Sequence, residues 1–190
     1  MNKTEVEYWT SFYNKKQLTT EPSLFCKFVM DYFKDLNDIK ILDAGCGSGR
    51  DSYYLSKKYK VMGVDTSFLP ENRENCEFNL SNFIYYAKGG FDVIYSRFTF
   101  HSITDDQQEE FIKSIEEKGV YLCIETRSKL DEELKKVHGK GHYRNYKDEE
   151  YIRNLLSVND FKILYLEESD SFSPYKDEKP FCIRVIAVKG

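Results

Sequence analysis

The sequence lacks the features of several protein classes. No apolar run in its 190 residues approaches the ~18 residues of a membrane span, and the first residues lead into no signal-peptide core. Positive charge is not in excess, because 28 Lys and Arg face 32 Asp and Glu, giving a net charge of -4 and a pI near 5.5. Domains that bind nucleic acid usually have a pI above ~9. We therefore expect a soluble, cytoplasmic protein that binds neither membranes nor nucleic acid.

Signals for disulfides and metals are also scarce. The five cysteines are scattered and odd in number, and none has C-x-x-C spacing, so we expect reduced residues in or near the core. Of the three histidines, His138 and His142 have helical spacing, but Gly139 and Gly141 oppose a helix there. The sequence predicts no metal site.

A glycine-rich turn is the most informative stretch of the chain. An apolar run leads to Asp43, and Gly45, Gly47 and Gly49 follow at alternate positions before a helical pattern begins. Glycines in such a turn permit positive φ and let the backbone approach a ligand closely. The pattern alone also fits a tight strand-to-helix turn. About 20 residues further on, a second apolar run ends in Asp65, where nucleoside-binding sheets place an acid against the ribose hydroxyls.

The carboxylate before the first glycine discriminates between cofactors. Dinucleotide sites usually read G-x-G-x-x-G and hold a pyrophosphate at a helix N-terminus. Asp43 would repel a pyrophosphate but suits a cationic ligand with an amino group. Together with Asp65 it favours S-adenosylmethionine, which is a sulfonium, over NAD.

At these residues the sequence resembles the class I S-adenosylmethionine-dependent methyltransferases, and the resemblance covers residues 40 to 188. It implies an α/β fold, a Rossmann-like three-layer sandwich with a mostly parallel seven-stranded sheet and an antiparallel last strand. We expect one domain over residues 1–190, since domains typically span ~100 to 200 residues. Within it, residues 1–38 would form an N-terminal helical lid.

The resemblance suggests further cofactor contacts. Asn82 stands where the family usually has an acid for the adenine amino group, and an amide oxygen can accept the same hydrogen bond. Phe83 would pack on the adenine ring or in the core. Ser96 ends a strand at the ligand crevice. Trp9 and Tyr13, on an amphipathic helical pattern, would face the methionine end of the cofactor or pack on the sheet edge.

Residues near the expected acceptor side suggest the chemistry. His101 follows the fourth strand and fits either a general base or a histidine that packs beneath the loop. Residues 126–147 form a basic, glycine-punctuated segment, and its candidates for an anionic acceptor are Arg127, His142, Tyr143 and Arg144. Arg184, in an apolar strand, is expected to face outward.

We therefore expect methyl transfer from S-adenosylmethionine to an oxygen or nitrogen of a small anionic acceptor, phosphorylated or phosphoramidate-like. Segments around Glu125, His142 and Pro180 look like those of small bacterial methyltransferases of capsule and cell-surface polysaccharide pathways. The alternative is a non-catalytic S-adenosylmethionine-binding regulatory or partner protein. The sequence does not distinguish oxygen from nitrogen acceptors, nor a monomer from an oligomer.

Overall fold

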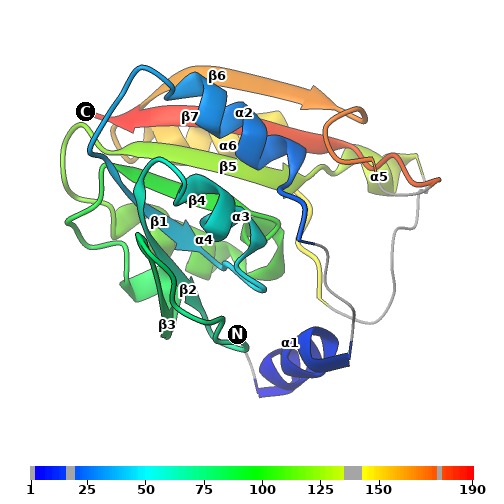
Figure 1. The fold of residues 1–190 in the computed structure, drawn as a ribbon. Helices are drawn as coiled ribbons and strands as arrows, with labels where there is room; N and C mark the ends of the chain where they lie inside the picture. Colours follow the sequence, from blue (N-terminus) through cyan, green and yellow to red (C-terminus); the bar gives the residue numbers. More distant parts are fainter. Residues whose placement is uncertain (1–2, 16–19, 135–142, 175–176) are drawn as a thin grey trace.

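A seven-stranded sheet organises the molecule (Figure 1). The computed structural model describes residues 3–15, 20–134, 143–174 and 177–190. The strands are β1 (Lys40–Ala44), β2 (Lys60–Asp65), β3 (Cys76–Leu80), β4 (Val93–Arg97), β5 (Tyr121–Arg127), β6 (Phe161–Ser169) and β7 (Cys182–Lys189). Their order is β3-β2-β1-β4-β5-β7-β6; β7 pairs antiparallel with both β5 and β6, and the other pairs are parallel. The predicted Rossmann-like sheet with an antiparallel last strand is confirmed.

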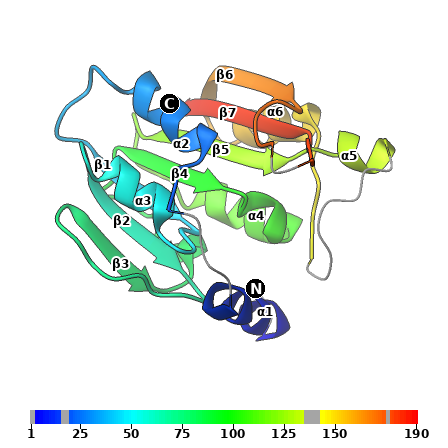
Figure 2. The ribbon, with the colours of Figure 1, turned by 45° about the vertical axis from the view of Figure 1, so that its right-hand side comes forward.

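Helices cover both faces of the sheet (Figure 2). They are α1 (Lys3–Lys15), α2 (Leu24–Tyr32), α3 (Arg50–Leu55), α4 (Asp105–Lys113), α5 (Leu130–Glu133) and α6 (Glu149–Ser157), with short 3-10 turns η1 (Phe83–Tyr85) and η2 (Phe100–Ser102). Helices α2 and α3 lie on one face and α4 and α6 on the other, which gives three layers. In both ribbon views α1 stands apart from these layers, near the β2–β3 side of the sheet.

Alternation along the buried strands divides the core between the two faces. Ile41 packs in the cluster shared with α2 and α3, whereas its neighbour Leu42 packs in the cluster shared with α4 and α6. Successive side chains of a strand point to opposite faces, so a strand covered on both sides is apolar at nearly every position. This explains the continuous apolar runs that precede Asp43 and Asp65.

Local signals in the sequence set helix starts. Thr104 and Gln107 form a capping box, since the Thr104 hydroxyl accepts from the Gln107 N–H and the Gln107 side chain accepts from the Thr104 N–H. Asp148 caps α6 in a similar way, accepting from the Tyr151 N–H at 2.8 Å. These caps fix where α4 and α6 begin on their face of the sheet.

The expectation that Arg184 faces outward is wrong. Its residue is 6% exposed, and the β5–β7 register places it directly opposite Glu125. The guanidinium can be buried because that carboxylate neutralises it across the strand pair. The sequence pattern of β7 alone did not show the opposing charge.

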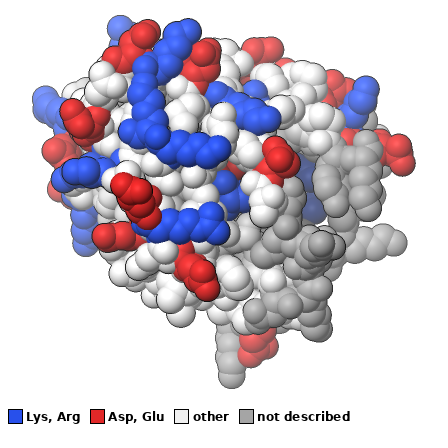
Figure 3. Space-filling view, in the orientation of Figure 1, with Lys and Arg blue, Asp and Glu red and all other residues white. Residues whose placement is uncertain are grey.

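The surface shows no dominant charge on the face seen in Figure 3, where Lys and Arg alternate with Asp and Glu. Within the described ranges, no helix is long and apolar enough to cross a membrane. The same part of the chain contains no cluster of three or more His, Cys, Asp or Glu placed to hold a metal ion.

Candidate active site

A cavity of about 630 Å³ opens at the carboxyl ends of the central parallel strands. Ligands of open α/β sheets bind at this edge, where the strand order reverses between β1 and β4. Asp43 and Asp65 line one part of the cavity, which we call the acidic end. Arg97 and Arg127 line another part, which we call the arginine end. The cavity therefore offers charges of both signs.

The glycine turn of the acidic end adopts the conformation that its residues predict. Gly45, Gly47 and Gly49 have φ values of +83°, +53° and +74°, which L residues with a Cβ rarely adopt. A Cβ on Gly45 would lie 2.2 Å from Thr99 Oγ1, and one on Gly47 would lie 2.3 Å from the Tyr13 hydroxyl. Gly45 lines the cavity, whereas the other two glycines shape the turn behind it.

Asp65 ties the end of β2 to the glycine turn. Its Oδ2 accepts from the Gly47 N–H at 2.9 Å, and its Oδ1 accepts from the Ser67 N–H at 2.8 Å and the Ser67 hydroxyl at 2.6 Å. The residue is 9% exposed and lines the cavity. The side chain is thus held in one orientation at the position predicted to meet a ribose.

Asp43 is a nearly buried carboxyl without a basic partner within ion-pair distance among the described residues. Its residue is 2% exposed, and its Oδ2 accepts from the Ser52 hydroxyl at 2.6 Å. Burial raises the pKa of Asp43 to about 7, the Ser52 hydrogen bond opposes this, and repulsion from Asp51 and Asp65 adds to it. A cation bound in the cavity would favour the ionised form.

Helix α1 brings aromatic side chains over the glycine turn. Trp9 and Tyr13 line the cavity, as their predicted role requires, and their rings stack with centroids 6.1 Å apart. Tyr13 also packs against Phe68, after β2, at 5.5 Å. Burial and then Asp65 raise the pKa of Tyr13 well above its usual value, so its hydroxyl keeps its proton.

The three remaining cofactor candidates differ in placement. Phe83 lines the cavity and is 3% exposed. Asn82 does not line it, because its Oδ1 caps η1 by accepting from the Ile84 N–H at 3.1 Å. Ser96 is also absent from the lining, and its buried hydroxyl has no hydrogen-bond partner in the described part of the chain. The structure therefore brings Phe83 to the cavity but not Asn82 or Ser96.

His101 does not line the cavity either. It is 4% exposed on η2, and its Nδ1 lies 3.2 Å from the Arg127 N, which donates to it, and 3.3 Å from Thr126 Oγ1. Its ring packs edge-on against Phe98 at 5.5 Å. Of the two interpretations, the geometry favours a histidine that packs beneath the loop.

The arginine end is organised around Phe98. The guanidinium carbons of Arg97 and Arg127 lie 4.1 and 5.1 Å from the Phe98 ring centroid. Phe98 has φ +58°, a left-handed conformation that is unusual for a bulky residue, and its N–H donates to the Glu125 carbonyl at 2.9 Å. Strain of this kind costs about 1 to 3 kcal/mol and clusters at ligand sites.

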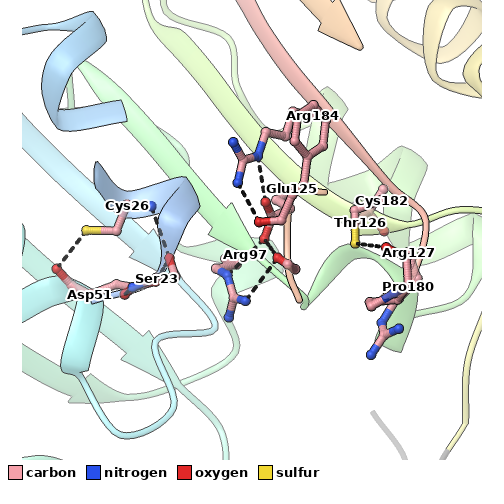
Figure 4. A network of polar contacts seen from close by, with 12 residues as sticks. Ser23, Cys26, Asp51, Arg97, Glu125, Thr126, Arg127, Pro180, Cys182 and Arg184 are labelled. Atoms are coloured by element: carbon pink, nitrogen blue, oxygen red, sulfur yellow. Dashed lines mark hydrogen bonds and ion pairs between the residues drawn. The ribbon is translucent and has the colours of Figure 1, made fainter. Parts of the chain in front are cut away.

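A buried carboxylate joins two arginines behind this end (Figure 4). Glu125 is fully buried, and its Oε1 accepts from Arg97 Nε at 2.9 Å while its Oε2 accepts from Arg184 Nε at 2.7 Å. The Ser173 hydroxyl also donates to Oε1 at 2.7 Å. Burial by itself lowers the pKa of Arg97. The nearby acidic groups, Glu125 first among them, outweigh this effect, so the pKa lies above its usual value.

Arg127 is less fully paired than Arg97. Its side chain is 12% exposed, and its Nη1 lies 3.7 Å from Asp131 Oδ2, beyond hydrogen-bond range. That buried Nη1 has no hydrogen-bond partner among the residues described. Burial lowers the pKa of Arg127, and the nearby Arg144 adds to this. Arg127 therefore lines the cavity with unused donor capacity.

Two other acceptor candidates, Tyr143 and Arg144, do not line the cavity. Tyr143 is 44% exposed, and Arg144 donates to the Tyr146 hydroxyl at 3.0 Å. His142 lies outside the described residues. Of the three predicted substrate residues that the structure describes, only Arg127 lines the cavity.

A polar cluster in the cavity wall joins three elements. Asp51 accepts from the Ser23 N–H, the Ser23 hydroxyl and the Tyr95 hydroxyl, each at 2.7 Å. Ser23 is also the N-cap of α2, accepting from the Cys26 N–H at 3.0 Å (Figure 4). The carboxylate of Asp51 thus anchors the start of α2 to α3 and β4.

Sequence reasoning missed three residues of the arginine end, namely Phe98, Phe172 and Ser173. It placed Arg97 and Ser96 together at the crevice but selected Ser96, although strand alternation puts the two side chains on opposite faces of β4. The β6–β7 segment gave no such signal, because its residues carry no periodic pattern.

Comparison with known proteins decides the family. The family model of a methyltransferase domain matches residues 17–166. This chain belongs to the methyltransferase-domain family. The family uses S-adenosylmethionine, so the predicted family and cofactor are confirmed. A probable S-adenosyl-L-methionine-dependent methyltransferase TehB of Haemophilus influenzae is 32% identical over 100 residues, which cover 47% of this chain and 35% of that protein. The match thus spans about a third of the relative's length.

Solved structures share the fold at low identity. A Burkholderia thailandensis 1,6-didemethyltoxoflavin-N1-methyltransferase is 17% identical with a TM-score of 0.69, covering 98% of this chain and 87% of that one. Magnesium protoporphyrin IX methyltransferase of Synechocystis PCC 6803 is 16% identical with a TM-score of 0.69, covering 100% and 96%. The [4+2]-cyclase SpnF, 13% identical, has a TM-score of 0.64 and covers 91% and 84%. The reaction must therefore be argued from the site.

Proposed function

We propose that this methyltransferase-domain protein transfers the methyl group of S-adenosylmethionine to an oxygen or nitrogen of a small anionic acceptor. The observation that carries the proposal is the distribution of charge in one cavity, with Asp43 and Asp65 at its acidic end and Arg97 and Arg127 at its arginine end. A cationic cofactor and an anionic acceptor would each meet groups of the opposite sign.

The acidic end fits the cofactor on three counts. Gly45 lines the cavity without a side chain, and the positive φ of the three glycines shapes the turn beside it. Asp65 is fixed by Gly47 and Ser67 with its carboxylate at the cavity, ready to accept from ribose hydroxyls. The pKa of Asp43 is raised to about 7, mainly by burial and although Arg97 opposes the rise, so its ionised form is not fully compensated and the cofactor's charged groups would stabilise it. When bound there, S-adenosylmethionine supplies an electrophilic methyl group.

The arginine end supports an anionic acceptor. Arg127 has a buried Nη1 without a hydrogen-bond partner among the described residues, and Arg97 directs only its Nε to Glu125. Guanidinium groups match carboxylate and phosphate oxygens by paired hydrogen bonds. These two side chains would orient the acceptor, and alignment contributes most of what methyl transfer needs from a protein.

An acceptor whose reacting atom is itself anionic, such as an acid oxygen or a phosphoramidate, needs no base. His101 lies outside the cavity lining, with Nδ1 occupied by the Arg127 N–H. An acceptor atom that arrives already deprotonated has no proton to give up. We therefore assign His101 a role in holding the backbone of Arg127, not in proton transfer.

Two segments complete the proposal. Within the N-terminal lid, residues 1–38, α1 would cover the cofactor through Trp9 and Tyr13, which line the cavity. Residues 126–147 would approach the acceptor through Arg127, at the end of β5. Capsular and cell-surface polysaccharide precursors, phosphorylated or phosphoramidate-like, are acceptors of the required charge and are our first candidates.

The test is a release assay for S-adenosylhomocysteine with the full chain, using pairs of acceptors that differ only in an anionic group and its uncharged ester. We expect turnover with the anionic member. Arg127→Ala should lower kcat/KM for that acceptor by about 10- to 100-fold, because a charge-assisted contact is worth roughly 1.5 to 3 kcal/mol. Calorimetry should show cofactor affinity unchanged within about twofold.

Arg153→Ala is the matched control, because Arg153 is about half exposed and pairs only with Glu149 on α6. Arg153→Ala should leave both kcat/KM for the anionic acceptor and the affinity for the cofactor unchanged. Equal use of the neutral ester, or a parallel loss of cofactor affinity in Arg127→Ala, would contradict the proposed acceptor site. Cofactor binding without turnover of any acceptor would favour the alternative function, a non-catalytic S-adenosylmethionine-binding regulatory or partner protein.

A further inference from the structure

We propose that Glu125 is a positioning residue that holds the arginine end in shape for an oxyanion of the acceptor. The inference deepens the proposed function and rests on it for the identity of the ligand. Glu125 does not line the cavity itself, so it would act through Arg97 and through the segment between β6 and β7.

The direction of the Glu125–Arg97 contact leaves Arg97 able to bind a ligand. Glu125 Oε1 accepts from Nε, which is the inner edge of the guanidinium, and not from the terminal nitrogens. Arg97 Nη2 makes only a 3.4 Å contact to Ser173 Oγ, and Nη1 has no hydrogen bond to the described residues. A guanidinium carries five N–H donors, so its terminal fork stays available at the cavity.

The second carboxylate oxygen fixes the opposite wall. Glu125 Oε2 accepts from Arg184 Nε at 2.7 Å, and Arg184 Nη2 donates to the Phe172 carbonyl at 3.0 Å. The guanidinium carbon of Arg184 lies 4.2 Å from the centre of the Phe172 ring. Phe172 and Ser173 both line the cavity, so one buried carboxylate positions Arg97 and the segment between β6 and β7 at the same site.

Stability alone gives a weak reason for this cluster. Replacing a buried ion pair or triad by apolar residues of similar volume is often neutral or stabilising. Near the Arg97–Glu125–Arg184 triad, Arg127 is paired only at 3.7 Å with Asp131. Glu125 is therefore shared by two guanidinium groups, and the Arg127–Asp131 contact is too long for a hydrogen bond, so Arg97 and Arg127 keep N–H donors for a ligand.

The terminal N–H groups of Arg97 and Arg127 indicate the chemistry of the ligand. Arg97 and Arg127 flank the Phe98 ring at 4.1 and 5.1 Å from its centroid. Guanidinium groups placed together on one cavity wall suit a group with two or more anionic oxygens, either a phosphate or a carboxylate. Phe98, held with φ +58°, would space them.

The test uses the full chain with S-adenosylhomocysteine bound. Its melting temperature is measured at increasing concentrations of inorganic phosphate or of acetate, and chloride keeps the ionic strength constant. We expect one of the two anions to stabilise the protein and so to name the oxyanion class. Glu125→Gln, which keeps the size of the side chain, should weaken that anion's apparent affinity by about tenfold, and Ser173→Ala by about threefold.

Turnover gives a readout that a purely structural role would not move. In Glu125→Gln the ratio of kcat/KM for an anionic acceptor to that for its neutral ester should fall, while the Kd for cofactor stays within about twofold. Asp92→Asn, at the opposite end of β4, is the control, since Asp92 only accepts from the Lys40 N–H. It should alter neither the anion affinity nor the ratio.

The outcomes separate this inference from the proposed function. Anion stabilisation that is lost in Glu125→Gln supports the inference even if no acceptor is methylated. Anion affinity equal in wild type and in a folded Glu125→Gln protein overturns it, even if methyl transfer proceeds. Absence of stabilisation by both anions in the wild-type protein also overturns it.

Discussion

The acidic end of the cavity is built from residues close together in the chain, and the arginine end from residues far apart. At the acidic end, hydrogen bonds join Asp43 to Ser52 and Asp65 to Gly47 and Ser67, over 9, 18 and 2 positions. At the arginine end, Glu125 reaches Arg97, Ser173 and Arg184 over 28, 48 and 59 positions. A short motif can therefore encode the first, whereas the second exists only once the sheet has formed.

The two ends also treat charge differently. Asp43 is nearly buried beside other acids, so its pKa is raised to about 7, whereas the Glu125 carboxylate is matched on both oxygens by guanidinium groups. A buried charge without a partner favours binding of a ligand of opposite sign, whereas a charge that is paired on both oxygens holds its partner side chains in position. The comparison predicts that changes at the acidic end act on cofactor binding and changes at the arginine end act on the acceptor.

The largest expected effect comes from Asp65→Ala, which would remove the predicted ribose acceptor and the partner of the Gly47 N–H. We expect the Kd for S-adenosylmethionine to rise by about 100-fold, corresponding to roughly 3 kcal/mol, measured by calorimetry. Asp92→Asn again serves as a carboxylate control remote from the cavity. An unchanged Kd in folded Asp65→Ala protein would break the assignment of the acidic end.

A smaller effect is expected from pH through Asp43. Because its folded-state pKa of about 7 exceeds the ordinary 3.8, the folded chain keeps a proton that the unfolded chain has lost. Its contribution to stability is therefore present at low pH and is lost as pH rises from about 4 to about 7. A cationic ligand favours the ionised carboxyl, so S-adenosylmethionine affinity should fall about fivefold from pH 7 to pH 6.

Calorimetry of Asp43→Asn across the same pH range sharpens that prediction. The amide cannot ionise, so its affinity should be weaker and lack this pH dependence. The Ser52 hydroxyl, which donates to Asp43 in the wild type, can still donate to the amide oxygen. Identical pH profiles for wild type and Asp43→Asn would show that another group is responsible.

The smallest expected effect on activity is that of His101→Asn. An asparagine oxygen can still accept from the Arg127 N–H, so kcat should change by less than about twofold. Removing a general base typically lowers the rate by about 10² to 10⁴. A loss of that size in steady-state kinetics, with thermal stability intact, would restore His101 as a base and alter the account of the arginine end.

The same contrast explains what the sequence could predict. Gly45, Gly47 and Gly49 require positive φ, and Asp43 and Asp65 end buried strands, so local chemistry predicts both the fold and the acidic end. The seven-stranded sheet and its antiparallel last strand were expected from the family resemblance, whereas the strand order was not predicted.

The arginine end escaped prediction because its contacts depend on strand register. Arg184 was expected to face outward, yet the β5–β7 pairing sets it against Glu125. His101 and Ser96 stood at the expected rim in the sequence, but side-chain direction took both away from the cavity lining. Chain position predicts which edge of a sheet a residue reaches, and packing determines where its side chain points.

The most direct measurement is a crystal structure of the full chain with S-adenosylhomocysteine bound. The account predicts nucleoside hydroxyls within about 2.6 to 3.2 Å of the Asp65 carboxylate, Asp43 facing the amino-acid part of the ligand, and Arg127 across the cavity from them. A nucleoside bound elsewhere, with the Asp65 carboxylate turned away from it, would contradict the assignment of the acidic end and of the acceptor site opposite.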